Sequence, residues 1–208
     1  MDDVVVVTLF RHALTEENRK KVYLGWSDSP LTPEGRDAVL RYRLRKDRYD
    51  YFLSSDLGRA VETMKLLFPD VRPDLSRDWR EMNFGAFEGK TYEELKDVRE
   101  YRLWLADLKR RKPPGGESFA DFARRVEKAW DELVERVVSQ HKRRPFVVTH
   151  GGVIRCLLSR YGPVEKDFWD WNLDHGSGYE LVFHIRQLRG KERCILLREA
   201  PLTEREPG

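Results

Sequence analysis

Three runs of apolar and β-branched residues predict buried β-strands. Residues 4–10, 51–53 and 146–149 are apolar almost throughout, and each run is followed by polar residues or glycine. Continuous runs of this kind are typical of strands covered on both faces, as in largely parallel sheets. Two further runs, residues 179–183 and 194–197, are expected to pair as a hairpin near the C-terminus.

Helical signals lie between these strands. Thr32, with proline next to it, and Asp56 stand where an N-cap is expected. Thr91 and Ser118 each precede an acidic residue by three positions, which is the pattern of a capping box. Apolar residues spaced three or four apart over 119–137 predict an amphipathic helix with one face in the core.

The alternation of strands and helices predicts an α/β fold. We expect a three-layer α/β/α sandwich with a mostly parallel central sheet. The length of 208 residues fits a single domain spanning residues 1–208. A Lys-Pro-Pro-Gly-Gly stretch ends at residue 116, and the segment of about 82–116 is expected to form a helical lid inserted over one end of the sheet.

Composition limits the classes of function. The 39 basic and 36 acidic side chains leave a net charge of +3, too small an excess for a protein that coats nucleic acid. The basic runs at 109–112 and 141–144 fall at predicted helix ends, where cations suit the helix dipole. Cys156 and Cys194 form neither a disulfide framework nor a metal-ligand spacing. Because no apolar run suits a membrane span or a secretory leader, we expect a cytoplasmic protein that binds neither nucleic acid nor membrane.

Basic and histidine side chains follow the three predicted buried strands. Arg11 and His12 follow the first strand, and Arg59 lies one helical turn beyond the second. His150 and Gly151 follow the third. Ligands of open α/β sheets bind beyond the carboxyl ends of the strands, so these residues are expected in one site. Each has an ordinary explanation by itself, as a solvated loop or a surface ion pair, but their joint placement favours a shared function.

These side chains suit a phosphoryl group. Two guanidinium groups can neutralise a phosphate dianion, and their charge favours the neutral, nucleophilic form of a nearby imidazole. One histidine can then attack phosphorus and carry the group covalently, while the other contacts an equatorial oxygen. The backbone N–H groups of Gly151 and Gly152, at a predicted helix start, are expected to add an anion site.

Six stretches of the chain carry a family resemblance. They are LFRHALTEEN at 9–18, GWSDSPLTPEG at 25–35, SSDLGRAVET at 54–63, EMNFGAFEG at 81–89, PGGES at 114–118 and VTHGG at 148–152. In this order they resemble the histidine phosphatase superfamily, which includes cofactor-dependent phosphoglycerate mutases and α-ribazole phosphatases. The resemblance implies an α/β fold and phosphomonoester chemistry that needs no metal and no cofactor.

The resemblance also implies roles for individual residues. His12 would be the nucleophile that forms a phosphohistidine. Glu81 would be the acid that protonates the leaving oxygen and then the base that activates water, whereas Glu88 is expected to be structural. His150 would join the catalytic set by holding a phosphoryl oxygen. The other residues implied for the phosphate pocket are Arg11, Thr15, Asn18 and Arg59.

One residue departs from the family pattern. Ala13 follows the expected nucleophile at a position where the family usually has glycine. If this position required a positive φ, alanine would cost roughly 1 kcal/mol and would shift His12.

The sequence favours a phosphatase over a mutase. After the acid glutamate, mutases of the family carry an Arg-His-Tyr sequence that grips a bisphosphorylated cofactor, and this chain has Met82, Asn83 and Phe84 there. Two cationic contacts to a second phosphate are therefore missing. A cofactor-dependent phosphoglycerate mutase is the alternative, and a non-catalytic phosphoester-binding or interaction module is the alternative from another class.

The expected substrate is a small phosphorylated metabolite. α-Ribazole 5′-phosphate is the compound to test first, because the pattern is most similar to that group, and a broad phosphatase for phosphoglycerate or sugar phosphates is the other candidate. Tyr92, Tyr101 and Trp104 of the predicted lid pack either against the leaving group or between helices. Trp169 and Trp171 either pack in the core, cover a pocket or join subunits, which leaves a monomer and a homodimer open.

Overall fold

A six-stranded β-sheet lies at the centre of the computed structural model, which describes residues 4–42 and 44–200. Its strands are β1 (Val4–Arg11), β2 (Tyr51–Ser55), β3 (Asp74–Ser76), β4 (Pro145–Thr149), β5 (Gly178–His184) and β6 (Leu196–Ala200). Their order across the sheet is β3-β2-β4-β1-β5-β6. The pairs from β3 to β1 are parallel, whereas β5 is antiparallel to both of its neighbours.

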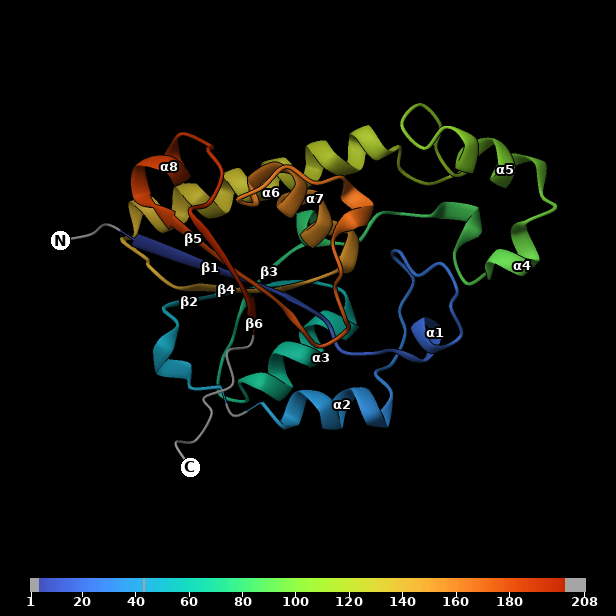
Figure 1. The fold of residues 1–208 in the computed structure, drawn as a ribbon. Helices are drawn as coiled ribbons and strands as arrows, with labels where there is room; N and C mark the ends of the chain where they lie inside the picture. Colours follow the sequence, from blue (N-terminus) through green and yellow to red (C-terminus); the bar gives the residue numbers. More distant parts are fainter. Residues whose placement is uncertain (1–3, 43, 201–208) are drawn as a thin grey trace.

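Helices and short 3₁₀ turns (η) connect the strands. Figure 1 shows α2 and α3 on one face of the sheet and α6, α7 and α8 on the other. The mostly parallel, three-layer α/β/α arrangement expected from the sequence is therefore confirmed. In chain order the elements are α1 (Glu16–Arg19), α2 (Pro33–Leu40), η1 (Lys46–Arg48), α3 (Gly58–Leu67), η2 (Arg77–Trp79), η3 (Gly85–Phe87), α4 (Tyr92–Leu95), α5 (Arg99–Ala106), α6 (Phe119–Ser139), α7 (Gly151–Tyr161), η4 (Phe168–Asp170) and α8 (Ile185–Arg189).

The core consists of one apolar cluster on each face of the sheet. Phe10 and Met64 belong to the cluster beneath α2 and α3, and Trp130 and Phe183 belong to the larger cluster beneath α6, α7 and α8. Within the described residues, every helix is too short or too polar to cross a bilayer.

Several helices begin at the side-chain caps expected from the sequence. Thr32 caps α2 and Ser118 caps α6, each by accepting a hydrogen bond from the backbone N–H three residues further on. Thr91 and Glu94 form a complete capping box at α4. These contacts satisfy N–H groups that the first helical turn leaves without partners.

The prediction that Asp56 caps a helix is wrong. α3 begins at Gly58 with Leu57 in the N-cap position and without a side-chain cap. Asp56 instead accepts two hydrogen bonds from the guanidinium of Arg80, each 2.6 Å long. A paired, charge-assisted contact is stronger than a single capping bond, so the carboxylate turns towards the arginine.

The sheet edges differ from the expectation in two places. β5 and β6 do pair in antiparallel fashion, but α8 lies between them and β6 begins at Leu196. The short edge strand β3 was not predicted, because its three residues include Asp74 and Ser76 and its apolar residue, Leu75, is 54% exposed.

The strand register brings three polar strand ends to one edge of the sheet. Arg11 at the end of β1 lies opposite Thr149 at the end of β4. Ser54 of β2 lies opposite Val148 of β4, so β2 ends at the same level. Residues 82–116, with η3, α4 and α5, lie beyond this edge, on the side towards which β1 runs (Figure 1).

Candidate active site

His12 lies directly after β1 and is buried, with 3% of its surface exposed. Its Nδ1 lies 2.7 Å from the carbonyl oxygen of Ala13. Because a carbonyl oxygen can only accept, Nδ1 carries the hydrogen and Nε2 of the neutral ring keeps its lone pair. The ring is therefore held in the tautomer that leaves Nε2 free to act as a nucleophile.

Ala13 fits its position without backbone strain. Among the described residues, the non-glycine residues with positive φ are Lys21, His141 and Lys191, so Ala13 has an ordinary φ. Its side chain is buried in the core cluster beneath α2 and α3, and its N–H donates to Thr63 Oγ1 at 3.0 Å. Alanine at this position therefore does not carry the backbone cost that a positive φ would impose.

Arg59, at the start of α3, is 1% exposed, and its guanidinium is held by backbone carbonyl oxygens of the loop at residues 25–27. Its Nη1 donates to the carbonyl of Ser27 at 2.9 Å and its Nη2 to that of Gly25 at 2.6 Å. Glu88 holds the same loop, since its carboxylate accepts from the backbone N–H groups of Trp26 and Ser27 at 2.8 and 2.6 Å. Glu88 has a structural role, as expected: it supports the carbonyls that orient Arg59.

Arg11 is the last residue of β1 and lies next to His12 in the chain. Its Nη1 donates to the carbonyl of Leu173 at 2.6 Å. A Cβ on Gly151 would lie 3.2 Å from Arg11 Nε, tighter than an ordinary contact. Gly151 therefore leaves the guanidinium the space it occupies.

Two more histidine rings lie against His12. The ring centroid of His150 is 5.1 Å from that of His12, and the centroid of His175 is 5.6 Å away. His150 Nε2 lies 2.8 Å from Ser55 Oγ. When the hydroxyl donates to Nε2, the hydrogen of the neutral ring is on Nδ1, which is then a donor to a ligand.

Four buried nitrogen atoms around His12 find no hydrogen-bond partner among the described residues: Arg11 Nε, Arg59 Nε, His150 Nδ1 and His175 Nε2. Buried polar atoms are rarely left unpaired, because each costs the free energy of its lost hydration. Two guanidinium groups and two imidazoles match the oxygens and the charge of a phosphoryl dianion. In the described part of the chain, no three His, Cys, Asp or Glu side chains gather as metal ligands would.

Burial and the guanidinium charges keep these histidines neutral. Burial first, and then Arg59 and Arg11, lowers the pKa of His12 well below its usual value. Burial and Arg59 lower the pKa of His150 in the same way. Burial and Arg11 lower the pKa of His175 to about 3. Burial also lowers the pKa of Arg11 and of Arg59 to about 10, so both guanidinium groups stay charged at neutral pH.

The carboxylate of Glu81 is held by two backbone N–H groups. Its Oε2 accepts from Gly152 at 2.8 Å and its Oε1 from Met82 at 2.9 Å. Gly152 belongs to the first turn of α7, so the anion bound at this helix start is the side chain of Glu81. A Cβ on Gly152 would overlap Glu81 Oε1, which only glycine avoids.

Comparison with known proteins identifies the family. The profile of the histidine phosphatase superfamily (branch 1) matches residues 7–193. The chain belongs to the histidine phosphatase superfamily. The adenosylcobalamin/α-ribazole phosphatase of Escherichia coli (strain K12) is 32% identical over 179 residues, which cover 81% of this chain and 85% of the relative.

Two solved structures agree with this assignment. The α-ribazole phosphatase of Shigella flexneri is 29% identical with a TM-score of 0.76, and the match covers 85% of this chain and 90% of that one. A phosphoglycerate mutase from Thermus thermophilus is 32% identical with a TM-score of 0.69, over 93% and 98% of the two chains. The family resemblance and the enzyme class expected from the sequence, a phosphatase, are confirmed.

In this histidine phosphatase, two side chains also clamp the backbone at Glu81. Its carbonyl accepts from Trp26 Nε1 at 2.8 Å and from Arg125 Nη2 at 3.1 Å. Arg125 forms a two-bond ion pair with Glu117, with distances of 2.8 and 2.7 Å, and Glu117 accepts from the N–H of Asn83 at 2.9 Å. Because Arg125 Nη1 also donates to the carbonyl of Arg80 at 2.9 Å, the pair fixes the chain on both sides of Glu81. The sequence places Glu117 in a motif, but neither its partner nor its role was expected.

Thr15 and Asn18 contact each other at the start of α1. Thr15 Oγ1 donates to Asn18 Oδ1 at 2.8 Å and accepts from the Asn18 N–H at 3.2 Å. The amide oxygen of Asn18 is therefore turned towards Thr15, which leaves its Nδ2 as the free donor. In the described part of the chain, neither residue hydrogen-bonds to His12, and the contact of Thr15 is with Asn18.

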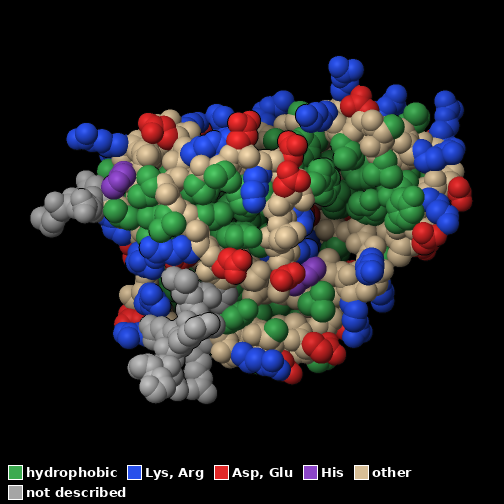
Figure 2. Space-filling view, in the orientation of Figure 1, with side chains coloured by type: hydrophobic (Ala, Val, Ile, Leu, Met, Phe, Trp, Pro, Cys, Tyr) green, Lys and Arg blue, Asp and Glu red, His purple; other side chains and the backbone are tan. Residues whose placement is uncertain are grey.

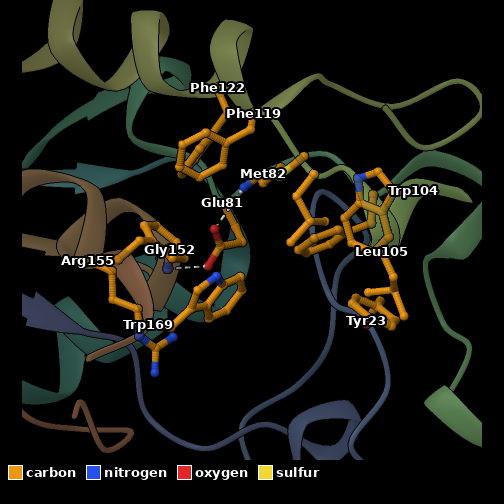
Figure 3. A pocket seen from close by; sticks show the side chains of 13 residues that line it. Tyr23, Glu81, Met82, Trp104, Leu105, Phe119, Phe122, Gly152, Arg155 and Trp169 are labelled. Carbon is orange, nitrogen blue, oxygen red and sulfur yellow. Dashed lines mark hydrogen bonds between the residues drawn. The ribbon is translucent and has the colours of Figure 1, made fainter. Parts of the chain in front are cut away.

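A cavity of about 220 Å³ opens beside Glu81. Figure 3 shows Glu81 between Gly152 and Arg155 on one side and Trp104 and Leu105 of α5 on the other. We call this space the aromatic cavity. Its other lining residues are Tyr23, Met82, Phe84, Leu108, Phe119, Phe122, Phe168 and Trp169.

The aromatic residues singled out in the sequence have different places. Trp104 and Trp169 line the aromatic cavity. Tyr101 and Trp171 are buried in the core, and Tyr92 is 55% exposed. Of the three lid residues singled out in the sequence, Tyr92, Tyr101 and Trp104, it is therefore Trp104 that lines the space beside Glu81.

Proposed function

We propose that this protein hydrolyses a small phosphomonoester through a phosphohistidine on His12. The observation that carries the proposal is the neutral His12 ring, with Nε2 free, surrounded by four buried nitrogen atoms without partners. Arg11, Arg59 and His150 would hold the phosphoryl oxygens. These three groups do not rearrange as charge develops, so they stabilise the transition state without a cost at that moment.

Three further residues, Asn18, Thr15 and Gly151, complete the phosphate pocket in this proposal. Asn18 donates from Nδ2 to a phosphoryl oxygen, and Thr15 sets its orientation. Gly151 contributes by leaving room for the guanidinium of Arg11.

In the first step, His12 Nε2 attacks phosphorus in line with the leaving oxygen. The N–P bond forms as the P–O bond breaks, and the electron pair of that bond goes to the leaving oxygen. Glu81 donates its proton to this oxygen, so a neutral alcohol departs.

In the second step, water takes the place of the alcohol. Glu81, now a carboxylate, accepts a proton from this water as its oxygen attacks phosphorus. The O–P bond forms, the N–P bond breaks, and inorganic phosphate leaves with His12 again neutral. The same carboxyl group serves both steps because both transfer a proton at the same position.

Hydrolysis fits this site better than phosphoryl transfer to a second substrate hydroxyl. Met82 and Phe84 line the aromatic cavity where a bisphosphorylated cofactor would need cations. An apolar wall would strip hydration from a second phosphate without replacing it. We propose α-ribazole 5′-phosphate as the first substrate to test, which the names of two similar proteins support.

The test is the release of inorganic phosphate from α-ribazole 5′-phosphate and p-nitrophenyl phosphate in the presence of EDTA. Wild type should turn over, and His12→Ala should lose about 10³-fold or more of kcat. His141→Ala, in the exposed turn after α6, is the matched control and should keep wild-type rates. Quenching in alkaline detergent during turnover of a substrate labelled in its phosphoryl group should trap label on the protein that is lost in acid and stable in base, as a phosphohistidine requires.

Three outcomes would contradict the proposal. Undiminished turnover in His12→Ala would exclude the phosphohistidine. Migration of phosphate within phosphoglycerate without release would favour the mutase. Binding of phosphoesters without any turnover would favour the non-catalytic module. Independence from metal, the cytoplasmic location and the lack of nucleic-acid binding remain predictions from the sequence.

A further inference from the structure

The position of Glu81 divides the site into two sides. In the proposed reaction its carboxyl group delivers a proton to the oxygen that joins phosphorus to the leaving alcohol. The group must therefore lie between the phosphoryl pocket and the rest of the substrate. Because Glu81 lines the aromatic cavity, this cavity is the space that receives the leaving alcohol.

The walls of the aromatic cavity suit an apolar group. Besides Glu81, the charged residue that lines it in the described part of the chain is Arg155, and the other side chains are aromatic or aliphatic. Trp104 is 4% exposed and belongs to the core, so this wall is fixed before a substrate binds. The volume of about 220 Å³ exceeds the about 150 Å³ of an engineered cavity that binds benzene.

A second, larger cavity of about 670 Å³ lies next to the aromatic cavity. The two share a wall of five side chains: Leu105, Leu108, Phe119, Phe168 and Trp169. Figure 2 shows hydrophobic side chains gathered around this hollow, between α5 and α7.

Two residues of the shared wall are open to water. Trp169 is 67% exposed and Leu105 is 40% exposed. Exposed apolar area at the mouth of a cavity is stabilised when a ligand covers it.

We propose that the substrates of this enzyme are phosphomonoesters of alcohols that carry a bulky apolar or aromatic group, and that this group binds in the aromatic cavity under Trp169 and Leu105. The inference rests on the proposed function and adds the chemistry of the leaving group. Compact polar alcohols, such as those of phosphoglycerate or phosphoserine, would lose hydration against these walls and would meet one cation, Arg155, in return. The segment 82–116, which supplies Trp104 and Leu105, then acts as the lid that selects the substrate.

The test compares two esters with the same phosphoryl group and similar alcohol acidity, 2-phenylethyl phosphate and ethyl phosphate. Burial of the phenyl ring should raise kcat/KM for the first ester about 10- to 100-fold above that for the second. Equal values for the two esters would overturn the inference while leaving the phosphatase intact. No phosphate release from either ester would instead overturn the proposed function.

Variants of the exposed wall locate the effect. Trp169→Ala and Leu105→Ala should each lower the ratio of the two kcat/KM values about 3- to 10-fold. Leu103→Ala is the matched control, because Leu103 lies on the same helix, is 37% exposed and does not line the aromatic cavity. A ratio that falls as much in Leu103→Ala as in Leu105→Ala, or that stays at the wild-type value in both cavity variants, would show that the ring binds elsewhere.

Discussion

The two sides of the active site are held in place by different forces. On the phosphoryl side, His12, Arg59 and His150 are buried at the edge of the sheet and are fixed by hydrogen bonds to carbonyl or hydroxyl oxygens. On the other side, the aromatic cavity is lined by apolar side chains, and Trp169 at its mouth is largely exposed. Stabilising a charged transition state needs oriented donors, whereas binding an apolar group needs only area that can be removed from water.

Glu81 belongs to both sides. Glu81 is fixed by hydrogen bonds, like the residues of the phosphoryl side. Four of them, from Gly152, Met82, Trp26 and Arg125, hold its carboxylate and its carbonyl. Its side chain nevertheless lines the aromatic cavity on the other side. Changes at Glu81 and its supports should therefore alter the departure of the alcohol while sparing the binding of phosphate.

Glu81→Gln should give the largest effect and should depend on the leaving group. We expect kcat/KM to fall about 10³-fold for ethyl phosphate, whose alcohol needs a proton, and about 10-fold or less for p-nitrophenyl phosphate, whose phenolate does not. Steady-state kinetics on both esters measure this difference. Equal losses on the two esters would mean that Glu81 does not protonate the leaving oxygen.

Gly152→Ala and Gly151→Ala form a matched pair that separates the two sides. A methyl on residue 152 overlaps Glu81 Oε1 and should lower kcat about 10²-fold by displacing the carboxylate. A methyl on residue 151 presses on Arg11 instead, so it should weaken competitive inhibition by inorganic phosphate about 3- to 10-fold. If both variants changed kcat and phosphate inhibition in parallel, the division of the site would be wrong.

Arg125→Lys should have a smaller effect, confined to kcat. Lysine keeps the charge but loses the fork that holds Glu117 and the carbonyl of Glu81, so we expect kcat to fall about 10-fold with KM within about twofold. Arg124→Lys, on the neighbouring exposed position of α6, is the control. A rise in KM with unchanged kcat would contradict a positioning role for Arg125.

His175→Asn should change the pH dependence of stability. In the folded protein the pKa of His175 is about 3, whereas in the unfolded chain it is about 6.5, so the unfolded state binds more protons between these values. Stability is therefore lost as pH falls below about 6.5. Urea unfolding at several pH values from 7 to 5 gives the free energy of unfolding as a function of pH. The slope of this free energy against pH should be lower in the variant, by the equivalent of about one bound proton. An unchanged slope would mean that His175 is protonated in the folded protein.

Much of the phosphoryl side is predictable because its residues follow apolar runs. The runs that become β1, β2 and β4 place Arg11, His12 and His150 at strand ends, and parallel pairing then brings those ends together. The sequence does not show the order of the strands in the sheet. The structure pairs β4 with both β1 and β2, which brings the three strand ends together as assumed. Gly152 shows a limit of this reasoning, since its N–H serves Glu81 and not an external anion.

The rest depends on contacts that leave no local pattern. His175 lies in an irregular loop before β5, whose sequence suggests an approach to the pocket but does not show that the ring lies beside His12. Arg125 is one of many charged residues on α6, and its hydrogen bond to the carbonyl of Glu81 spans 44 positions. Asp56 looks like a helix cap until Arg80 is placed beside it. Periodicity reports which face of an element is buried and is silent about which polar partners meet.

The central place of β1 has a consequence for synthesis of the chain. In the sheet, β1 lies between β4 and β5, so its partners are residues 145–149 and 178–184. Translation at about 5–20 residues per second delivers those partners on the order of 10 s or more after β1. His12, the proposed nucleophile, is thus made well before His150 and His175, whose rings lie against it in the folded protein. Catalytic activity of a nascent or truncated chain would report completion of the whole sheet.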